Sequence, residues 1–267
     1  MSSVDELQQA EKETKSHWQR RWLSLWDNGL REIVIVGALF GCYRISSGVL
    51  PDSDVLAFQN AHDIVNLEKS LGLFVEQDFQ SFFVDSSFLT HLVNTIYTIF
   101  YYPALIIFAI WAYIYHRPQY FVVRNILLVS GAIAFICFAL YPTAPPRMLP
   151  ELGFIDTTGS SYNAVNYDSP LLKGITNPYA AMPSVHFAWT LLAGTATIYI
   201  ARTWWLKALG ALIPLCMLVS IVATANHFIL DAIAGVVVLG LAYGIVTSFS
   251  RLRKGAISQA LEDQDGV

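Results

Sequence analysis

Long apolar runs dominate the hydrophobic pattern of the chain. Six of them approach the length of about 20 residues that a helix needs to cross a bilayer. They lie at about 30–50, 88–115, 121–141, 184–202, 205–225 and 228–249. Arg44 and His186 interrupt the first and the fourth, which are the weakest of the six. The pattern predicts an all-α, polytopic membrane domain over residues 30–250 with six transmembrane helices.

The segments before and after these runs are polar. Within residues 1–29, Trp18, Trp22 and Trp26 recur every four residues, so they share one face of a helix, and four Lys and Arg residues lie near them. This predicts an N-terminal amphipathic helix in the headgroup region, with a partner-binding helix as the alternative. Residues 251–267 are predicted to be a cytoplasmic tail, disordered after Arg253.

Two further segments are neither spans nor ordinary turns. Residues 52–87 alternate apolar patches with seven acidic side chains, which predicts an interfacial or re-entrant segment. Residues 142–183 are rich in Pro, Gly and Asn and have no helical period, so they are predicted to form a loop.

The distribution of Lys and Arg orients the predicted spans. With the N-terminus inside, 12 of the 16 Lys and Arg residues fall in cytoplasmic segments, Lys69, Arg147 and Lys173 fall outside, and Arg44 lies near the outer end of the first span. Both termini are therefore predicted to be cytoplasmic. The end of the third span and the starts of the fourth and sixth then meet the extracytoplasmic face, and these three ends carry the candidate chemistry.

Composition agrees with a protein integral to a plasma or inner membrane. Only 13% of the residues are charged, against about 25% in soluble domains. There is no basic stripe for nucleic acid, and Cys42, Cys137 and Cys216 are too far apart for a zinc site or a disulfide framework. The six histidines show no metal-binding spacing, so no metal or cofactor is expected. Membrane lipids are the expected partners, and homo-oligomers remain open.

The first candidate group, Tyr141–Arg147, lies where the third span leaves the membrane. Pro142, Pro145 and Pro146 stiffen this exit. The guanidinium of Arg147 offers a planar fork that matches phosphate oxygens. An interfacial arginine that touches lipid headgroups is the alternative.

The second group, Met182–His186, opens the fourth span. Ser184 can cap the helix or donate to an anion, and the free amides at a helix start favour a negative ligand. His186 lies within one turn of this candidate anion site.

The third group, Asn226–Asp231, opens the sixth span. His227 and Asp231 are four residues apart and share a helix face. The carboxylate can accept the proton of one imidazole nitrogen and leave the other nitrogen exposed, as a histidine nucleophile or base requires. A structural ion pair between helices is the alternative.

These motifs together resemble the type 2 phosphatidic acid phosphatase superfamily, whose members are six-span enzymes that act on lipid phosphates. Pro183–His186 resembles its second signature, and His227 with Asp231 resembles its third. The segments Tyr141–Arg147 and Ala181–His186 look closest to the subgroup that contains inositol phosphorylceramide synthase. The resemblance covers about residues 90–245.

The resemblance implies a role for each candidate residue. His227 would attack phosphorus and form a phosphohistidine, and Asp231 would orient it. His186 would protonate the leaving alcohol and then deprotonate the acceptor, while Arg147 and Ser184 would hold the phosphoryl oxygens. The substrate would be a phospholipid or a polyprenyl phosphate.

The sequence departs from the phosphatase-type signatures at two cationic positions. Leu140 stands where those signatures have a Lys, and Ile221 where they have an Arg. Asn226 is a candidate to compensate in phosphate binding. The departures fit a phosphotransferase of the synthase-like subgroup better than a phosphatase. A non-enzymatic lipid or ion transporter with a His–Asp proton relay is the alternative from another class, and it predicts ionisable residues spread along a path through the membrane.

Overall fold

The computed structural model describes residues 29–35, 37–38, 41, 54–157 and 177–265. The chain divides into two units, Met1–Ser46 and Ser47–Val267. In the first unit, residues 29–35 are helical. The amphipathic helix predicted within residues 1–29 and more than half of the first predicted span lie outside the described residues. The fold and the site below belong to the second unit.

Four helices in the described part of the chain are long and apolar enough to cross a membrane. They are Ser87–Tyr115, Arg117–Leu140, Trp204–Ala223 and Ile229–Leu252. They match the second, third, fifth and sixth predicted spans. The prediction of an all-helical membrane protein is therefore confirmed, with four of the six predicted spans found as candidate spans among the described residues.

The fourth predicted span is a shorter helix than expected. Helix α8 (Val185–Ile200) has 16 residues, which corresponds to about 24 Å of helix against a hydrocarbon core of about 30 Å. It packs closely against α9 (Trp204–Ala223). A methyl group on Gly194 would meet the carbonyl of Gly210 and the ring of Pro214, so only glycine permits this approach.

The candidate span Ser87–Tyr115 is built from three pieces. It contains α4 (Ser87–Thr95), the π-helical turn η1 (Ile96–Phe100) and α5 (Tyr101–Tyr115). Ser86 begins it as an N-cap, because its hydroxyl accepts the N–H of Leu89 at 3.4 Å. Single π-turns inside helices are frequent at functional sites. Here the turn carries Tyr97.

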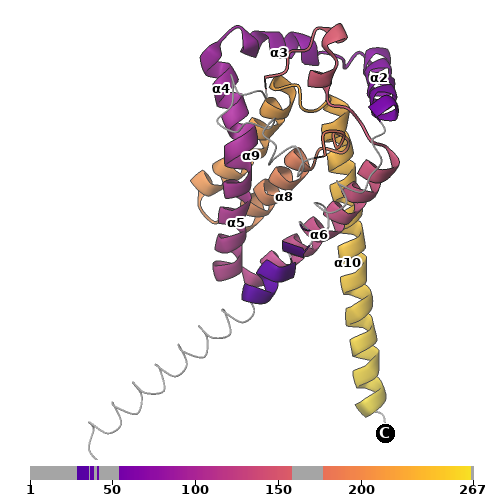
Figure 1. Cartoon of the computed structure of the whole chain (residues 1–267). Coiled ribbons are helices and arrows are strands. Elements are labelled where there is room, and N and C mark those ends of the chain that lie inside the picture. Colours follow the sequence, from indigo (N-terminus) through magenta and orange to yellow (C-terminus); the bar gives the residue numbers. More distant parts are fainter. Residues whose placement is uncertain (1–28, 36, 39–40, 42–53, 158–176, 266–267) are drawn as a thin grey trace, which may run out of the picture. The chain divides into compact units, whose positions relative to one another are not determined.

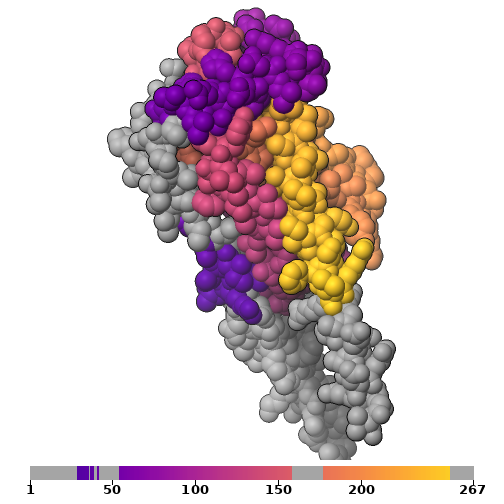
Figure 2. All heavy atoms as spheres, turned by 90° about the vertical axis from the view of Figure 1, so that its right-hand side faces the viewer, coloured from indigo at the N-terminus to yellow at the C-terminus, as the bar shows by residue number. Residues whose placement is uncertain are grey.

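Helix α10 (Ile229–Asp265) continues past the predicted end of the sixth span at about residue 249. The tail that the sequence predicted to be disordered after Arg253 is therefore helical as far as Asp265. The helix α6 (Arg117–Leu140) packs along α10, and Figure 2 shows the two side by side.

The predicted interfacial segment folds as two helices outside the four candidate spans. They are α2 (Asp54–Leu71) and α3 (Glu76–Val84), joined by a turn in which Gly72 has φ +70°. Figure 1 shows them at the end of the unit where α10 begins. The buried face of α2 joins one hydrophobic cluster with the loop after α6 and the turn before α10. Its fully buried members are Ala57, Ala61, Ala144, Leu149, Ala225 and Phe228. This cluster fixes the loops that carry the site.

Candidate active site

A tight turn after α9 places His227 before the start of α10. Ala225 adopts the left-handed conformation with φ +50°, although alanine rarely does so. The backbone N–H groups of Asn226 and His227 both donate to the carbonyl of Ile221, at 3.0 and 3.2 Å. His227 is only 4% exposed. The turn therefore holds the imidazole inside the protein beside the first turn of α10.

The protonation of the His227 ring follows from its contacts. Its Nδ1 lies 2.8 Å from the carbonyl oxygen of Ala181 and 3.4 Å from Oδ2 of Asp231. A carbonyl can only accept a hydrogen bond, so Nδ1 carries the proton. Nε2 of the neutral ring then has a free lone pair. This buried atom has no hydrogen-bond partner among the described residues.

Asp231 does more than face the histidine. Its Oδ2 accepts the backbone N–H of Phe228 at 2.9 Å, and its carbonyl accepts the N–H of Ser184 at 2.9 Å. The carboxylate thus caps its own helix while its backbone joins α10 to the start of α8. The sequence anticipated the approach of Asp231 to His227, but the shortest contact of Nδ1 is the carbonyl of Ala181.

The structure places His186 opposite His227. The centroids of the two rings are 5.8 Å apart, and their planes are inclined by 52°. The rings of Tyr97 and Tyr101 lie 4.6 and 4.4 Å from the ring of His186. The structure thus shows both tyrosines packed against the second histidine.

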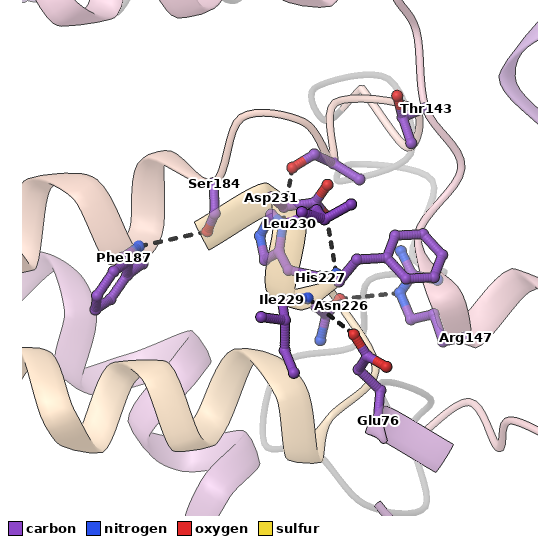
Figure 3. Close-up of polar contacts among 12 residues, drawn as sticks. Glu76, Thr143, Arg147, Ser184, Phe187, Asn226, His227, Ile229, Leu230 and Asp231 are labelled. Atoms are coloured by element: carbon purple, nitrogen blue, oxygen red, sulfur yellow. Dashed lines mark hydrogen bonds and ion pairs between the residues drawn. The ribbon is translucent and has the colours of Figure 1, made fainter. Parts of the chain in front are cut away.

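Arg147 reaches the same region from the loop after α6. Its Nε donates to Oδ1 of Asn226 at 2.9 Å (Figure 3), and its Nη1 lies 3.4 Å from Oδ2 of Asp156. Its backbone N–H donates to the carbonyl of Ala225 at 2.8 Å. The guanidinium is therefore held next to the residue that precedes His227, with 18% of the side chain exposed.

The loop that carries Arg147 is itself fixed by backbone hydrogen bonds. The N–H of Thr143 donates to the carbonyl of Tyr179 at 2.8 Å, and the N–H of Ala181 returns to the carbonyl of Thr143 at 3.3 Å. The N–H of Ala144 donates to the carbonyl of Ala57 at 3.1 Å. Because Ala181 also binds the ring of His227, the pairing connects the Arg147 loop to the histidine.

Ser184 and Asn226, the other two predicted phosphate ligands, have contacts within the protein. The hydroxyl of Ser184 accepts the N–H of Phe187 at 3.4 Å and so caps α8. The side-chain amide of Asn226 donates to Oγ1 of Thr224 at 2.8 Å while its oxygen binds Arg147. Both side chains lie beside the histidine pair, and their binding of phosphate stays a prediction.

The first turn of α8 keeps donors available beside the two histidines. No acceptor among the described residues binds the backbone N–H of Val185 or His186. Such N–H groups at the start of a helix form a natural site for an anion. The sequence predicted an anion site at this helix start, and the geometry is compatible with it.

Sequence reasoning missed two buried acids at the site, Glu68 and Glu76. Both are 0% exposed. Oε1 of Glu76 accepts the N–H of Ile229 at 3.0 Å, and Oε1 of Glu68 accepts the N–H of Leu230 at 2.8 Å. A signal was available for Glu68, because it continues the buried face of α2 formed by Ala61 and Val65.

Burial has a strong electrostatic effect on Glu68. Burial, together with the hydrogen bond and the charge of the neighbouring Glu76, raises the pKa of this carboxyl from 4.5 to about 9. Glu68 therefore carries its proton at neutral pH. Among the described residues, no group of three His, Cys, Asp or Glu side chains could hold a metal ion.

Comparisons with known proteins give a match over most of this region. The sequence model of the PAP2 superfamily matches residues 62–245. The chain is 25% identical over 219 residues to the phosphoinositol dihydroceramide synthase of Bacteroides thetaiotaomicron, an alignment that covers 74% of this chain and 70% of the relative. No solved structure matches the chain.

Proposed function

Because the chain belongs to the PAP2 superfamily, we propose that it transfers a phosphoryl group from a lipid-linked phosphate through a phosphohistidine at His227. The family and the synthase-named relative support a membrane lipid phosphatase or phosphotransferase as the class of enzyme. The donor would be a phospholipid or a polyprenyl phosphate, and the acceptor would be water or an alcohol.

One observation carries the proposal. The buried Nε2 of His227 has no partner among the described residues, while Nδ1 is held as a donor by Ala181. The nucleophilic lone pair is thus oriented in advance, and a second imidazole lies opposite, with the two ring centroids 5.8 Å apart. An oriented nucleophile with an acid–base group opposite it is the arrangement that a two-step displacement at phosphorus requires.

The two imidazoles divide the chemistry of the first step. The Nε2 lone pair of His227 forms a bond to phosphorus, and the bond between phosphorus and the leaving lipid oxygen breaks. His186, in its protonated form, gives that oxygen a proton. The positive charge on the phosphorylated ring is stabilised by the carbonyl of Ala181 and by Asp231, which lie 2.8 and 3.4 Å from Nδ1.

The second step returns the enzyme to its starting state. The hydroxyl of water or an alcohol attacks phosphorus, His186 takes its proton, and the bond between phosphorus and Nε2 breaks. Arg147 and the free N–H groups of Val185 and His186 would stabilise the negative charge on the phosphoryl oxygens during both steps. Ser184 would support this site by capping the start of α8, and Asn226 would support it by holding the guanidinium of Arg147.

We favour an alcohol over water as the acceptor. The relative is named a synthase, and the sequence resembles the synthase-like subgroup at Tyr141–Arg147. We propose that the site lies on the extracytoplasmic face and both termini in the cytoplasm, because Lys and Arg are concentrated in the segments predicted to be cytoplasmic. A transporter with a proton relay is less well supported, because His186, His227 and Asp231 gather at one end of their helices.

The test offers the purified protein in detergent a panel of phosphatidic acid, polyprenyl pyrophosphate and phosphatidylinositol, each with and without a ceramide acceptor. Release of free phosphate identifies a phosphatase, and formation of a new phosphorylated lipid identifies a transferase. The His227→Ala variant should be folded and inactive. If no lipid is turned over by wild-type protein, or if His227→Ala keeps full activity, the proposal fails.

A further inference from the structure

Three acidic side chains accept hydrogen bonds from three consecutive backbone N–H groups at the start of α10. Asp231 accepts from Phe228 at 2.9 Å, Glu76 from Ile229 at 3.0 Å and Glu68 from Leu230 at 2.8 Å. The first N–H groups of a helix have no partner within the helix and need one from elsewhere. All three acids are 0% exposed, so water does not compete for these donors.

Two of the three acids come from outside the spans. Glu68 lies in the last turn of α2, and Glu76 is the first residue of α3. The turn between the two helices is closed by the N–H of Leu73, which donates to the carbonyl of Glu68 at 2.8 Å. Oε2 of Glu76 accepts the N–H of Val75 at 3.0 Å. Both acids therefore extend from the two helices that this turn joins, which we call the α2–α3 hairpin.

The capped turn is the one on which the histidine depends. His227 directly precedes Phe228, and its Nδ1 lies 3.4 Å from Asp231 in that same turn. If the first turn of α10 shifts, the ring shifts with it relative to the carbonyl of Ala181 and to His186. In Figure 3, Glu76 approaches Ile229 from the side away from Ser184, so α10 is held between the hairpin and the start of α8.

We propose that Glu68 and Glu76 are positioning residues that hold the first turn of α10 and thereby direct Nε2 of His227 toward the reacting phosphorus. The inference rests on the proposed phosphoryl transfer. Neither acid contacts the substrate in this account. Their loss should lower kcat and leave KM nearly unchanged, because a misplaced nucleophile reacts slowly on substrate that is bound normally.

The protonation of Glu68 gives the arrangement a measurable signature. The groups that face it are Glu76 from α3 and Asp231 from α10, both acids, together with the N–H of Leu230. Its Oε2 has no hydrogen-bond partner among the described residues. Loss of the proton would place a further negative charge among these acids and push the first turn of α10 away from the hairpin. The activity of the wild-type enzyme should therefore fall as the pH rises toward about 9.

The experiment compares Glu68→Ala, Glu68→Gln and Glu76→Ala with the control Thr90→Val, in full-length protein in detergent. Thr90 is also buried, and its hydroxyl binds the carbonyl of Phe83 at 2.8 Å, away from α10. We expect the two alanine variants to lose tenfold or more in kcat, since a displacement of 1 Å costs about 100-fold. KM should stay within twofold, and Thr90→Val should keep wild-type kcat per folded molecule.

Glu68→Gln decides the matter if the alanine variants do not fold. It keeps the acceptor for Leu230 and resembles the protonated acid, so kcat at neutral pH should stay within threefold of wild type and the decline toward about pH 9 should disappear. Wild-type kcat in folded Glu68→Ala, a loss no larger than in Thr90→Val, or an unchanged alkaline decline in Glu68→Gln would overturn the inference.

A measurement that needs no substrate separates this inference from the proposed function. In ¹⁵N-histidine-labelled protein, the Nδ1–H tautomer of His227 should give a distinct signal that is retained in Glu68→Gln and Thr90→Val and altered in Glu76→Ala. If no lipid is turned over but the signal changes in this way, the proposed function fails and the positioning role stands. If turnover is found and the signal is the same in every variant, the positioning role fails alone.

Discussion

Replacing Gly235 with alanine should separate the two histidines without removing any catalytic group. A Cβ at this position would lie 2.8 Å from the carbonyl oxygen of Ser184 and 3.4 Å from Cβ of Ala188. Ser184 caps α8 two residues before His186, and Gly235 lies in the second turn of α10. The added methyl group must therefore push the starts of α8 and α10 apart.

The expected size of the effect follows from the contact. An ordinary carbon–oxygen contact is about half an ångström longer than 2.8 Å, so the helices must shift by about that much. Overpacking of this kind costs about 1–3 kcal/mol of stability. A shift of half an ångström between His186 and His227 should cost about tenfold in kcat, given about 100-fold for 1 Å.

The matched control is Gly240→Ala on the same helix. A Cβ there has no atom within 4 Å among the described residues. Lipid turnover and thermal stability in detergent are measured for both variants. Gly240→Ala should keep wild-type turnover and stability, whereas Gly235→Ala should lose both. Equal behaviour of the two variants would refute the inference that close approach of α8 and α10 sets the distance between the histidines.

Three further predictions follow from the site. Arg147→Lys loses the Nε bond to Asn226 and the planar fork, so kcat/KM should fall by about 10- to 100-fold in steady-state assays, and a change below twofold would remove Arg147 from phosphate binding. Asp231→Asn should slow formation of the phosphoenzyme by at least tenfold in rapid-quench assays, because a neutral amide stabilises the phosphorylated ring less well; an unchanged rate would contradict this role. Because the pKa of Glu68 is raised to about 9 in the folded state, the folded state binds more protons than the unfolded state between about pH 4.5 and 9. Stability should therefore fall as the pH rises through this window, which scanning fluorimetry in detergent can measure. The fall should be smaller in Glu68→Gln, and parallel curves of stability against pH for the variant and the wild type would contradict the raised pKa of Glu68.

The sequence predicted the helices well wherever the apolar pattern was long. The spans expected at 121–141 and 205–225 correspond to Arg117–Leu140 and Trp204–Ala223, because about 20 apolar residues in a row have few other solutions. Length was harder to read at the fourth predicted span, because α8 runs only from Val185 to Ile200 within the predicted residues 184–202. The charged tail after residue 250 gave no apolar signal, yet α10 continues into it.

The candidate site was predictable in its residues and not in its contacts. His186, His227 and Arg147 stood out because ionisable side chains are rare beside apolar helices, and the structure brings all three to one region. The carbonyl of Ala181 could not be foreseen, since a backbone group has no signature in the sequence. Glu76 was equally hidden, because its partner Ile229 is 153 residues away.

Direct detection of a phosphoenzyme tests the central claim most sharply. Wild-type protein is mixed with a ³²P-labelled lipid substrate and quenched within milliseconds under alkaline conditions, where phosphohistidine survives and phosphoserine does not. The account predicts label that is lost in acid, that maps to His227 by mass spectrometry and that is absent from His227→Gln. Label on another residue, or wild-type turnover by His227→Gln, would contradict it.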